Sequence, residues 1–251
     1  MKTDLFHQEQ QKEYKKAIII GASSGMGKEL CRILVRKDYA VGITGRRENL
    51  LKELQAESPE RIYYRAFDIR DMSKTTKGLR ELIRELGGLD LLVLSSGAGF
   101  INEELEPEPE FQTIYTNVTA FTDIMTFTYN WFEKHPPGHI AAITSIAALR
   151  GNPVAPAYNA TKAYQSNYLE ALRLKYRKSG RPVTVTDIRP GFVKTDMAKG
   201  DRLFWVASPE KAASLIYNAI RRKKRVAYIS RRWRLLAILL KLTPRWMYEK
   251  L

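Results

Sequence analysis

Short apolar runs alternate along the chain with longer stretches in which apolar residues recur every three or four positions. The first pattern predicts buried strands and the second predicts amphipathic helices. Seven runs of the first kind lie at 17–21, 40–44, 62–67, 89–95, 139–145, 182–188 and 225–230. Helical spacing is clear in 29–34 and 79–86, and the stretch 111–134 is long enough for a helix of several turns. Because most of the predicted strands are continuously apolar or rich in β-branched residues, we expect helices on both of their faces.

Strands that alternate with helices at this spacing predict an α/β fold with a doubly wound parallel sheet of the Rossmann type. The length of 251 residues suits one domain of this kind. We expect three segments: a polar N-terminal arm over 1–16, the sheet domain over 17–230 and a basic amphipathic C-terminal extension over 231–251. The arm lacks the apolar core of a secretory signal.

Composition narrows the possible chemistry. Hydrophobic residues make up 44% of the chain, which allows a sizeable buried core. Cys31 is the only cysteine, which excludes an intramolecular disulfide framework and favours a reducing, cytoplasmic location. The three histidines, His7, His135 and His139, are scattered, so we expect no metal site.

The first predicted strand runs into a glycine-rich turn that contains Gly21, Gly25 and Gly27, spaced G-x-x-x-G-x-G. Glycine permits positive φ and close approach of the backbone to a diphosphate, and the following helix N-terminus offers free N–H groups and a positive dipole end. The spacing differs from the common G-x-G-x-x-G fingerprint. Its position after the first strand favours a dinucleotide site over a merely tight turn.

Two arginines, Arg46 and Arg47, follow the second predicted strand. Dinucleotide folds that use NAD usually place an acid here for the ribose 2′-hydroxyl, whereas an arginine accommodates the 2′-phosphate of NADP. No acid occurs before Glu48, so the sequence favours NADP(H). The alternative is a pair of solvated arginines at a helix start, where positive charge is mildly unfavourable.

The segment 158–162 reads YNATK and places a tyrosine four residues before a lysine. On a helix, Tyr158 and Lys162 would rise one turn apart on the same face. A tyrosine hydroxyl ordinarily has a pKa near ~10, and a neighbouring ammonium lowers that pKa because it favours the phenolate. The pair is a candidate proton-transfer site or, alternatively, an ordinary tyrosine and lysine on a half-buried helix.

Several motifs, in order along the chain, resemble those of the short-chain dehydrogenase/reductase family, over about residues 17–230. They are GASSGMG at 21–27, Asp68 in FDIRD, LSSGAG at 94–99, Asn117 in YTNVTAF, Ser145 thirteen residues before Tyr158, and RPGFVKTDM at 189–197. The chain departs from the family pattern at Ile20, where threonine is usual, and at Ser95 and Ser96, which replace the usual Asn-Ala.

This resemblance implies a set of four catalytic residues. Tyr158 would protonate a carbonyl oxygen during reduction, or accept the proton in the reverse direction. Lys162 would lower the pKa of Tyr158 and hydrogen-bond the nicotinamide ribose. Ser145 would donate to the substrate oxygen, a role of the oxyanion-hole type. Asn117 would hold a water that relays protons through Lys162.

The resemblance also implies which residues bind NADP(H). Asp68 would contact the adenine, and Val193 and Thr195 would contact the cofactor after the sixth strand. The full expected set is Gly21, Ser23, Ser24, Gly25, Met26, Gly27, Arg46, Arg47, Asp68, Ile69, Ser95, Ser96, Gly97, Tyr158, Lys162, Pro190, Gly191, Val193 and Thr195.

The segment 197–208 follows the last motif, at the point where this family places its substrate lid. Its glycine, charges and aromatics suggest a loop that closes over the site. Phe204 and Trp205 either line an apolar pocket or anchor the loop, and Ala147, just past the expected catalytic serine, offers no charge. We therefore expect NADPH-dependent reduction of a small, fairly hydrophobic carbonyl compound, or oxidation of the matching secondary alcohol.

The formal net charge of +15 is concentrated near the C-terminus, because residues 221–251 hold eleven Lys or Arg and one acid. The apolar run 235–240 is far shorter than the ~20 residues needed to span a bilayer. A basic helix with Trp and Leu on its other surface is a candidate for a membrane interface. The alternative is packing on the domain or on a partner subunit, since this family commonly forms homodimers or homotetramers.

Two other classes of function compete with an enzyme. The chain could bind NADP(H) as a sensor or scaffold associated with a membrane surface through its basic tail, but the complete Ser-Tyr-Lys-Asn set argues against this. It could also be chiefly a nucleic-acid or membrane-binding module. No recognised nucleic-acid motif accompanies the basic tail, so we expect no specific nucleic-acid partner. The expected location is cytoplasmic, with peripheral membrane contact as an option.

Overall fold

A seven-stranded, fully parallel sheet forms the centre of the molecule in the computed structural model, which describes residues 14–195 and 204–250. The strands are β1 (Lys15–Ile20), β2 (Tyr39–Gly45), β3 (Ile62–Ala66), β4 (Leu91–Leu94), β5 (Gly138–Ile143), β6 (Val183–Pro190) and β7 (Val226–Ile229). Their order in the sheet is β3-β2-β1-β4-β5-β6-β7, so the strand order reverses between β1 and β4. The prediction of a doubly wound parallel sheet is confirmed.

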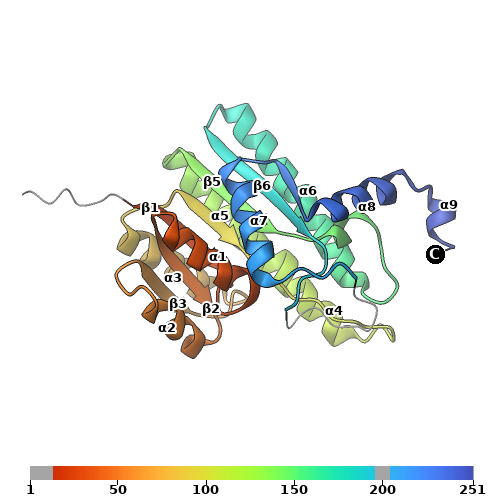
Figure 1. Cartoon of the computed structure of the whole chain (residues 1–251), viewed down its shortest axis with the longest axis horizontal. Coiled ribbons are helices and arrows are strands. Elements are labelled where there is room, and N and C mark those ends of the chain that lie inside the picture. Colours follow the sequence, from red (N-terminus) through yellow and green to blue (C-terminus); the bar gives the residue numbers. More distant parts are fainter. Residues whose placement is uncertain (1–13, 196–203, 251) are drawn as a thin grey trace, which may run out of the picture.

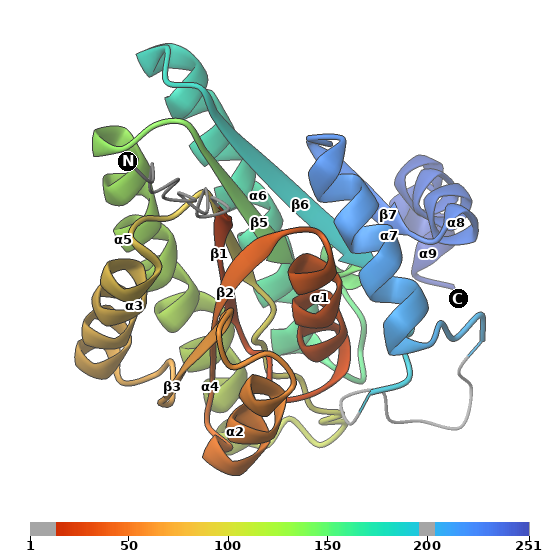
Figure 2. The same cartoon turned by 60° about the vertical axis from the view of Figure 1, so that its left-hand side comes forward.

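Helices cover both faces of this sheet (Figure 1, Figure 2). They are α1 (Gly25–Arg36), α2 (Glu48–Ala56), α3 (Met72–Leu86), α4 (Pro107–Ile114), η1 (Tyr115–Ala120), α5 (Phe121–Lys134), η2 (Ile146–Leu149), α6 (Pro156–Ser179), α7 (Pro209–Arg221), α8 (Arg231–Leu242) and α9 (Arg245–Tyr248). One face packs against α1, α2 and α7, and the other packs against α3, α5 and α6.

The central strand β1 explains why the predicted strands show no polar alternation. Ala17 and Ile19 belong to the core shared with α1 and α7, whereas Ile18 and Ile20 belong to the core on the opposite face. All four side chains are fully buried. A strand covered on both faces must be apolar at every position, as the sequence pattern indicates.

The stretch 111–134, expected to be one helix, contains the end of α4, the π-helical turn η1 and the whole of α5. A π turn adds a residue to the helical repeat and is frequent at functional sites. Asn117 lies in this turn and is fully buried. The helix was predictable from the sequence, but the π turn that carries Asn117 was not.

Strand β1 begins at Lys15, two residues before the expected start of the domain at residue 17. The backbone N–H of Lys16 donates to Asp90 over 2.7 Å, and its ammonium donates to the carbonyl of Gly87 over 3.0 Å. Lysines can extend the strand here because this end lies at the surface. Residues 1–13 of the expected arm and residues 197–203 of the expected lid lie outside the described residues.

The C-terminal extension packs on the domain and projects at one end of the molecule (Figure 1). In α8, Trp233 and Ala237 are buried. The Arg150 guanidinium donates to the carbonyl of Leu240 over 3.0 Å and also to that of Thr243. These contacts join α8 to the loop that follows η2, and this loop adjoins the candidate active site.

Candidate active site

The turn after β1 leaves room only for glycine. Gly21 has φ of +91°, and an added Cβ would lie 2.4 Å from Oγ of Ser96 and 2.6 Å from its backbone nitrogen. The N–H groups of Ser95 and Ser96 both donate to the carbonyl of Ile20, over 2.8 Å and 2.9 Å. The ends of β1 and β4 therefore lie against each other at the point where the strand order reverses, which is where doubly wound sheets bind ligands.

Helix α1 begins at Gly25, beside the segment that follows β6. Gly25 has φ of +57°, and its added Cβ would lie 3.1 Å from Cγ2 of Thr195. The N-cap residue Ser24 makes no side-chain capping hydrogen bond. The structure thus brings the glycine turn and the Thr195 segment together at a helix N-terminus, a place suited to an anionic group. Gly27 packs so closely that a Cβ would lie 2.0 Å from the carbonyl oxygen of Gly21.

Of the two arginines after β2, Arg47 contacts the glycine turn. Its Nη2 donates to Oγ of Ser24 over 2.6 Å and to Oγ of Ser23 over 3.0 Å. Both Arg46 and Arg47 are exposed. Arg47 therefore places a guanidinium at the turn, with Arg46 beside it.

Asp68 and Ile69 follow β3 at the neighbouring strand end. Asp68 forms an ion pair with Arg70 at 2.7 Å. The hydrogen bond from Arg70 lowers the pKa of Asp68, and the charge of Arg46 acts in the same direction. The side chain of Ile69 is buried in the core with α3. Met26 likewise packs against the core on the α1 side.

Tyr158 lies in the first turn of α6, with Lys162 one turn further along the helix. The Tyr158 ring lies against the backbone after β4, because a Cβ on Gly99 would come within 2.5 Å of it. Ser145 is the second residue after β5, and its side chain lies near enough to Tyr158 to influence the pKa of the tyrosine. The fold thus brings together the serine, tyrosine and lysine that the sequence predicted.

The pKa shifts at this site differ from the expectation. Burial raises the pKa of Tyr158, and the nearby Ser145 side chain opposes that rise. Burial also lowers the pKa of Lys162 to about 8, opposed by the charge of Asp187. The Lys162 ammonium lies 5.7 Å from the centroid of the Tyr158 ring. The expected lowering of the Tyr158 pKa was wrong for this structure, because loss of solvation is the largest influence on this hydroxyl and raises its pKa.

Asn117 ties the segment after β4 to α6. Its Oδ1 accepts from the N–H of Ala98 over 2.9 Å, and its Nδ2 donates to the carbonyl of Ala98 over 2.7 Å and to Thr161 over 3.0 Å. A Cβ on Gly97 would lie 3.3 Å from Nζ of Lys162 and 3.4 Å from Oδ1 of Asn117. Because residue 97 is a glycine, the Lys162 ammonium and the Asn117 amide can both lie close to the backbone after β4.

Gln165 is a member of this network that the sequence analysis missed. Its Nε2 donates to the backbone carbonyl of Asn117 over 2.9 Å, and its Oε1 accepts from Nζ of Lys162 over 3.0 Å. The side chain is 2% exposed. The backbone carbonyl of Asn117, the residue expected to hold a relay water, thus accepts from a side chain. The sequence feature that could have indicated Gln165 is its position three residues after Lys162, on the same face of the helix.

Asp187 is a second missed residue, buried inside β6. It accepts from the hydroxyl of Thr144 over 2.5 Å and pairs with Arg189 at 2.7 Å. Thr144 directly precedes Ser145, and the charge of Asp187 raises the pKa of Lys162. The sequence indicated this residue as an acid inside an otherwise uncharged predicted strand, since buried charges are paired.

Asn159, next to Tyr158, holds the segment 147–150, which was expected to face the substrate. Its Nδ2 donates to the carbonyl of Ala147 over 3.1 Å and to that of Arg150 over 2.7 Å. The N–H of Ala147 in turn donates to Oγ of Ser145 over 3.1 Å. The loop expected to face the substrate is therefore fixed by the same helical turn that carries the tyrosine.

The segment after β6 is covered by an aromatic cluster that includes α8. A Cβ on Gly191 would lie 1.9 Å from the indole of Trp233. Phe204 and Trp205 lie 5.2 Å and 5.9 Å from Trp233, measured between ring centroids. Phe204 and Trp205 therefore contact α8, and these contacts are compatible with both alternatives, a pocket wall and a loop anchor. Pro190 and Val193 are buried beside this cluster. The role of Trp233 had no signal in the sequence.

Within the described residues, no group of three or more His, Cys, Asp and Glu side chains could hold a metal ion. His139 is buried, its Nε2 lies 2.8 Å from Oγ1 of Thr186, and burial lowers its pKa to about 4. Over the same residues, no helix is both long and apolar enough to cross a membrane.

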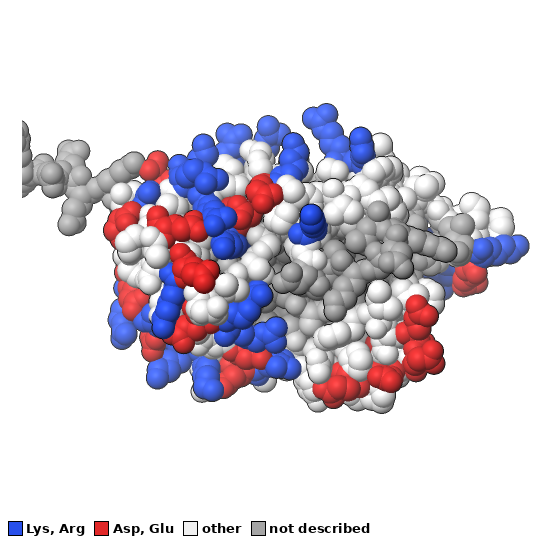
Figure 3. Space-filling view, turned by 60° about the horizontal axis from the view of Figure 1, so that its bottom comes forward, with Lys and Arg blue, Asp and Glu red and all other residues white. Residues whose placement is uncertain are grey.

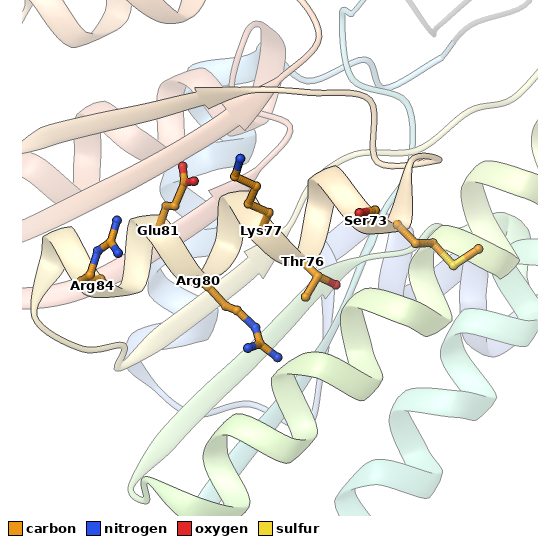
Figure 4. Close-up of a pocket in the computed structure, with 7 residues that line it drawn as sticks. Ser73, Thr76, Lys77, Arg80, Glu81 and Arg84 are labelled. Atoms are coloured by element: carbon orange, nitrogen blue, oxygen red, sulfur yellow. The ribbon is translucent and has the colours of Figure 1, made fainter.

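A separate hollow on the surface belongs to α3. Its lining residues are Met72, Ser73, Thr76, Lys77, Arg80, Glu81 and Arg84 (Figure 4). Lys77 and Glu81 project on one side of the helix, and Thr76 and Arg80 project on the other. None of these residues belongs to the expected catalytic or cofactor-binding sets, so the hollow is separate from the candidate active site.

The glycine turn at a strand-order reversal, together with the Ser-Tyr-Lys group on neighbouring elements, defines a dehydrogenase-type site on a doubly wound sheet. The sequence model of the short chain dehydrogenase family matches residues 15–203. The chain belongs to the short-chain dehydrogenase/reductase family, a family of oxidoreductases.

Two relatives illustrate this membership. An uncharacterized oxidoreductase of Myxococcus xanthus is 34% identical over 189 residues, which cover 73% of this chain and 74% of the relative. A probable NADP-dependent dehydrogenase of Haemophilus influenzae is 29% identical, with 70% of each chain covered.

Solved structures share the fold. A short-chain dehydrogenase from Streptomyces avermitilis has a TM-score of 0.79 at 20% identity, covering 91% of each chain. A 3-ketoacyl-(acyl-carrier-protein) reductase from Brucella melitensis, complexed with NADH, has a TM-score of 0.78 at 21% identity, covering 86% of this chain and 97% of that one. ElxO with NADP bound has a TM-score of 0.74 at 21% identity, covering the same shares of each chain.

Proposed function

We propose that this chain is an NADPH-dependent oxidoreductase that reduces the carbonyl group of a small, fairly hydrophobic compound, with Tyr158 as the acid. The observation that supports this most directly is the position of Tyr158, near Ser145 and one helical turn from Lys162. A proton donor, a second polar group for the substrate oxygen and a cation thus lie within one site.

The residues around the glycine turn fit a dinucleotide. Gly21 and Gly25 adopt positive φ at the start of α1, and Arg47 lies at the same turn. A guanidinium there can bind a 2′-phosphate through two parallel hydrogen bonds. The Haemophilus relative is named NADP-dependent, and the structural neighbours hold NADP or NADH, so the preference for NADPH rests mainly on Arg46 and Arg47. When bound, the reduced nicotinamide supplies a hydride.

The proposal places Tyr158 as the proton donor in the direction of reduction. A phenol with a pKa above its ordinary value is protonated at neutral pH, so Tyr158 carries the proton that a developing alkoxide needs. Ser145 orients the substrate oxygen toward Tyr158. Lys162 supplies positive charge beside them, and its pKa of about 8 keeps most of that charge at pH 7.

Gln165 acts as a positioning residue in this proposal. It bonds the Lys162 ammonium through Oε1 and the Asn117 carbonyl through Nε2, and thereby links the two groups that a water was expected to bridge. A carboxamide holds these groups in place, but it does not pass a proton on as readily as a water does. We therefore assign Asn117 and Gln165 to holding Lys162 in position.

The surroundings of the site suggest an uncharged substrate. Ala147 in η2 and the aromatic cluster of Phe192, Phe204 and Trp233 offer apolar surface beside Ser145 and Gly191. Apolar walls with a few fixed polar groups are typical of small-molecule sites. A homodimer or homotetramer is part of the same proposal, and sedimentation velocity of the full chain tests it.

The test of the function is a screen of uncharged ketones and aldehydes with NADPH, followed at the nicotinamide absorbance. We expect turnover with apolar carbonyl compounds and little with charged ones. The Tyr158→Phe variant, assayed on the same compounds, removes only the hydroxyl. Binding of NADPH without turnover of any compound by the wild type would contradict the enzymatic proposal.

A further inference from the structure

Helix α8 presents a stripe of large apolar side chains to solvent. Leu235, Ile238, Leu239 and Leu242 are 69%, 47%, 62% and 75% exposed. Their spacing of three, four and seven positions places them on one face of the helix. A helix on a protein surface ordinarily turns such a face inward, so we expect another molecule to cover this stripe.

The opposite face of α8 is already in use. Trp233 and Ala237 are 3% and 1% exposed, and Trp233 lies on Gly191. The Arg150 guanidinium bonds the carbonyls of Leu240 and Thr243 at the end of the helix. Because these contacts fix the rotation of α8 about its axis, the exposed stripe cannot turn inward onto its own domain.

Basic residues border the stripe on both sides. At 3.6 residues per turn, Arg232 lies on one flank, and Arg234 and Lys241 lie on the other. Residues 231–250 contain Arg231, Arg232, Arg234, Lys241, Arg245 and Lys250 against the single acid Glu249. One group of exposed acids lies over α4 and the segment before it (Figure 3). Trp246 in α9 is 64% exposed.

We propose that this face of α8, together with α9, docks on the surface of an anionic lipid bilayer. The leucine stripe would lie at the boundary of the acyl chains, the flanking basic side chains would reach the lipid phosphates, and tryptophan suits the same interface. A second copy of the chain fits less well. A two-fold contact through this face would bring together two helices that both carry positive charge.

Docking in this way would set one side of the candidate active site next to the lipid. Arg232 lies 5.8 Å from the Trp205 ring, and Phe204 and Trp205 are about half exposed beside Trp233. The proposal does not depend on the catalytic one, because it rests on the charge and exposure of α8 and α9 alone.

The test is flotation of the full chain with vesicles of phosphatidylcholine, with and without phosphatidylserine. We expect flotation only with phosphatidylserine and a loss at high salt. The double variant Leu235→Glu/Leu239→Glu should bind at least about ten-fold more weakly. Arg234→Glu and Lys241→Glu should each weaken binding by about five-fold or more. Leu174→Glu on α6, at a site 59% exposed, is the matched control and should bind like the wild type.

Three results would overturn the proposal. One is a wild type that does not float with either vesicle. Another is a double variant that floats as well as Leu174→Glu does. The third is a fall in sedimentation mass in the double variant, which would make the stripe a contact between copies of the chain. Circular dichroism checks that the variants fold. If a variant does not fold, the lipid dependence of flotation by the wild type tests the proposal on its own.

Discussion

Lys162 and Gln165 are hydrogen-bonded to each other inside α6, with the ammonium donating to Oε1 over 3.0 Å. The other end of the Gln165 amide donates to the backbone of Asn117. The lysine at the centre of the candidate site is therefore held by a residue on its own helix, which is in turn fixed by the π turn η1.

This relationship predicts opposite effects for two substitutions of Gln165. Gln165→Leu removes an acceptor and should lower the pKa of Lys162 below about 8, whereas Gln165→Glu adds a negative charge and should raise it. The basic limb of the pH profile of kcat should move in those directions. Hydrogen bonds to charged groups contribute about 1.5–3 kcal/mol, so Gln165→Leu should lower kcat by roughly ten-fold or more. Gln112→Leu on α4 is the control. If the basic limb of the pH profile lies at the same pH in the wild type and in every variant, Gln165 does not position Lys162.

Tyr158→Phe should abolish most carbonyl reduction and leave NADPH binding intact. Only the proton donor is lost, and general acid catalysis typically contributes about 10²–10⁴-fold. Tyr164→Phe, on the same helix but 37% exposed, should keep wild-type turnover. The measurements are kcat and a fluorescence titration with NADPH. Turnover of Tyr158→Phe near the wild-type rate on an authentic substrate would be incompatible with the proposed mechanism.

Arg46→Ala and Arg47→Ala should each weaken NADPH more than NADH. A lost charge-assisted hydrogen bond of about 1.5–3 kcal/mol corresponds to a loss of roughly ten- to a hundred-fold in affinity for NADPH. We expect the larger loss for Arg47, which already contacts Ser23 and Ser24. Arg80→Ala, on α3, is the control for a change in net charge. Equal losses for both cofactors in calorimetric titrations would show that neither arginine distinguishes them.

Lys162 should make the free energy of unfolding depend on pH. Its pKa falls from an ordinary 10.5 to about 8 on folding, so between these values the unfolded chain holds a proton that the folded chain has released. Stability therefore rises with pH across that window, and below about pH 8 the whole penalty of burying the ammonium is present. The difference amounts to about 3 kcal/mol.

Lys162→Met should remove this rise. Urea unfolding of both proteins from about pH 7 to about pH 10.5 measures it, with the variant serving as the reference for the other lysines and tyrosines. Lys178→Met, at an exposed position on the same helix, should retain the full slope. Parallel curves for the wild type and Lys162→Met would show that this ammonium is not desolvated.

Gly191 and Trp233 should be energetically coupled. A methyl group at residue 191 would overlap the indole, at 1.9 Å, so Gly191→Ala should destabilise the protein by about 1–3 kcal/mol through overpacking. Trp233→Ala removes the obstacle and should itself be destabilising. In that background, Gly191→Ala should have little further effect. Thermal unfolding of the four proteins in this cycle measures the coupling, and strictly additive losses would mean that the two residues do not share this contact.

The amino-acid sequence determined the order and type of the main elements. Runs such as 17–20 are apolar at every position because helices cover both faces of β1, and that requirement is visible in the sequence. It also indicated the candidate catalytic residues, through the resemblance of its motifs to those of the short-chain dehydrogenase/reductase family. The spacing of Tyr158 and Lys162 by itself placed only these two on one helical turn.

Only the tertiary structure decided the surroundings of those residues. The bonds of Gln165 depend on a π turn 48 positions earlier in the chain, and the contact of Trp233 with Gly191 depends on where α8 packs. The sequence predicted a lowered pKa for Tyr158 from its neighbour Lys162, but the fold buries both groups and raises it. Loss of solvation depends on every element packed around a side chain, and spacing along one helix carries no information about that.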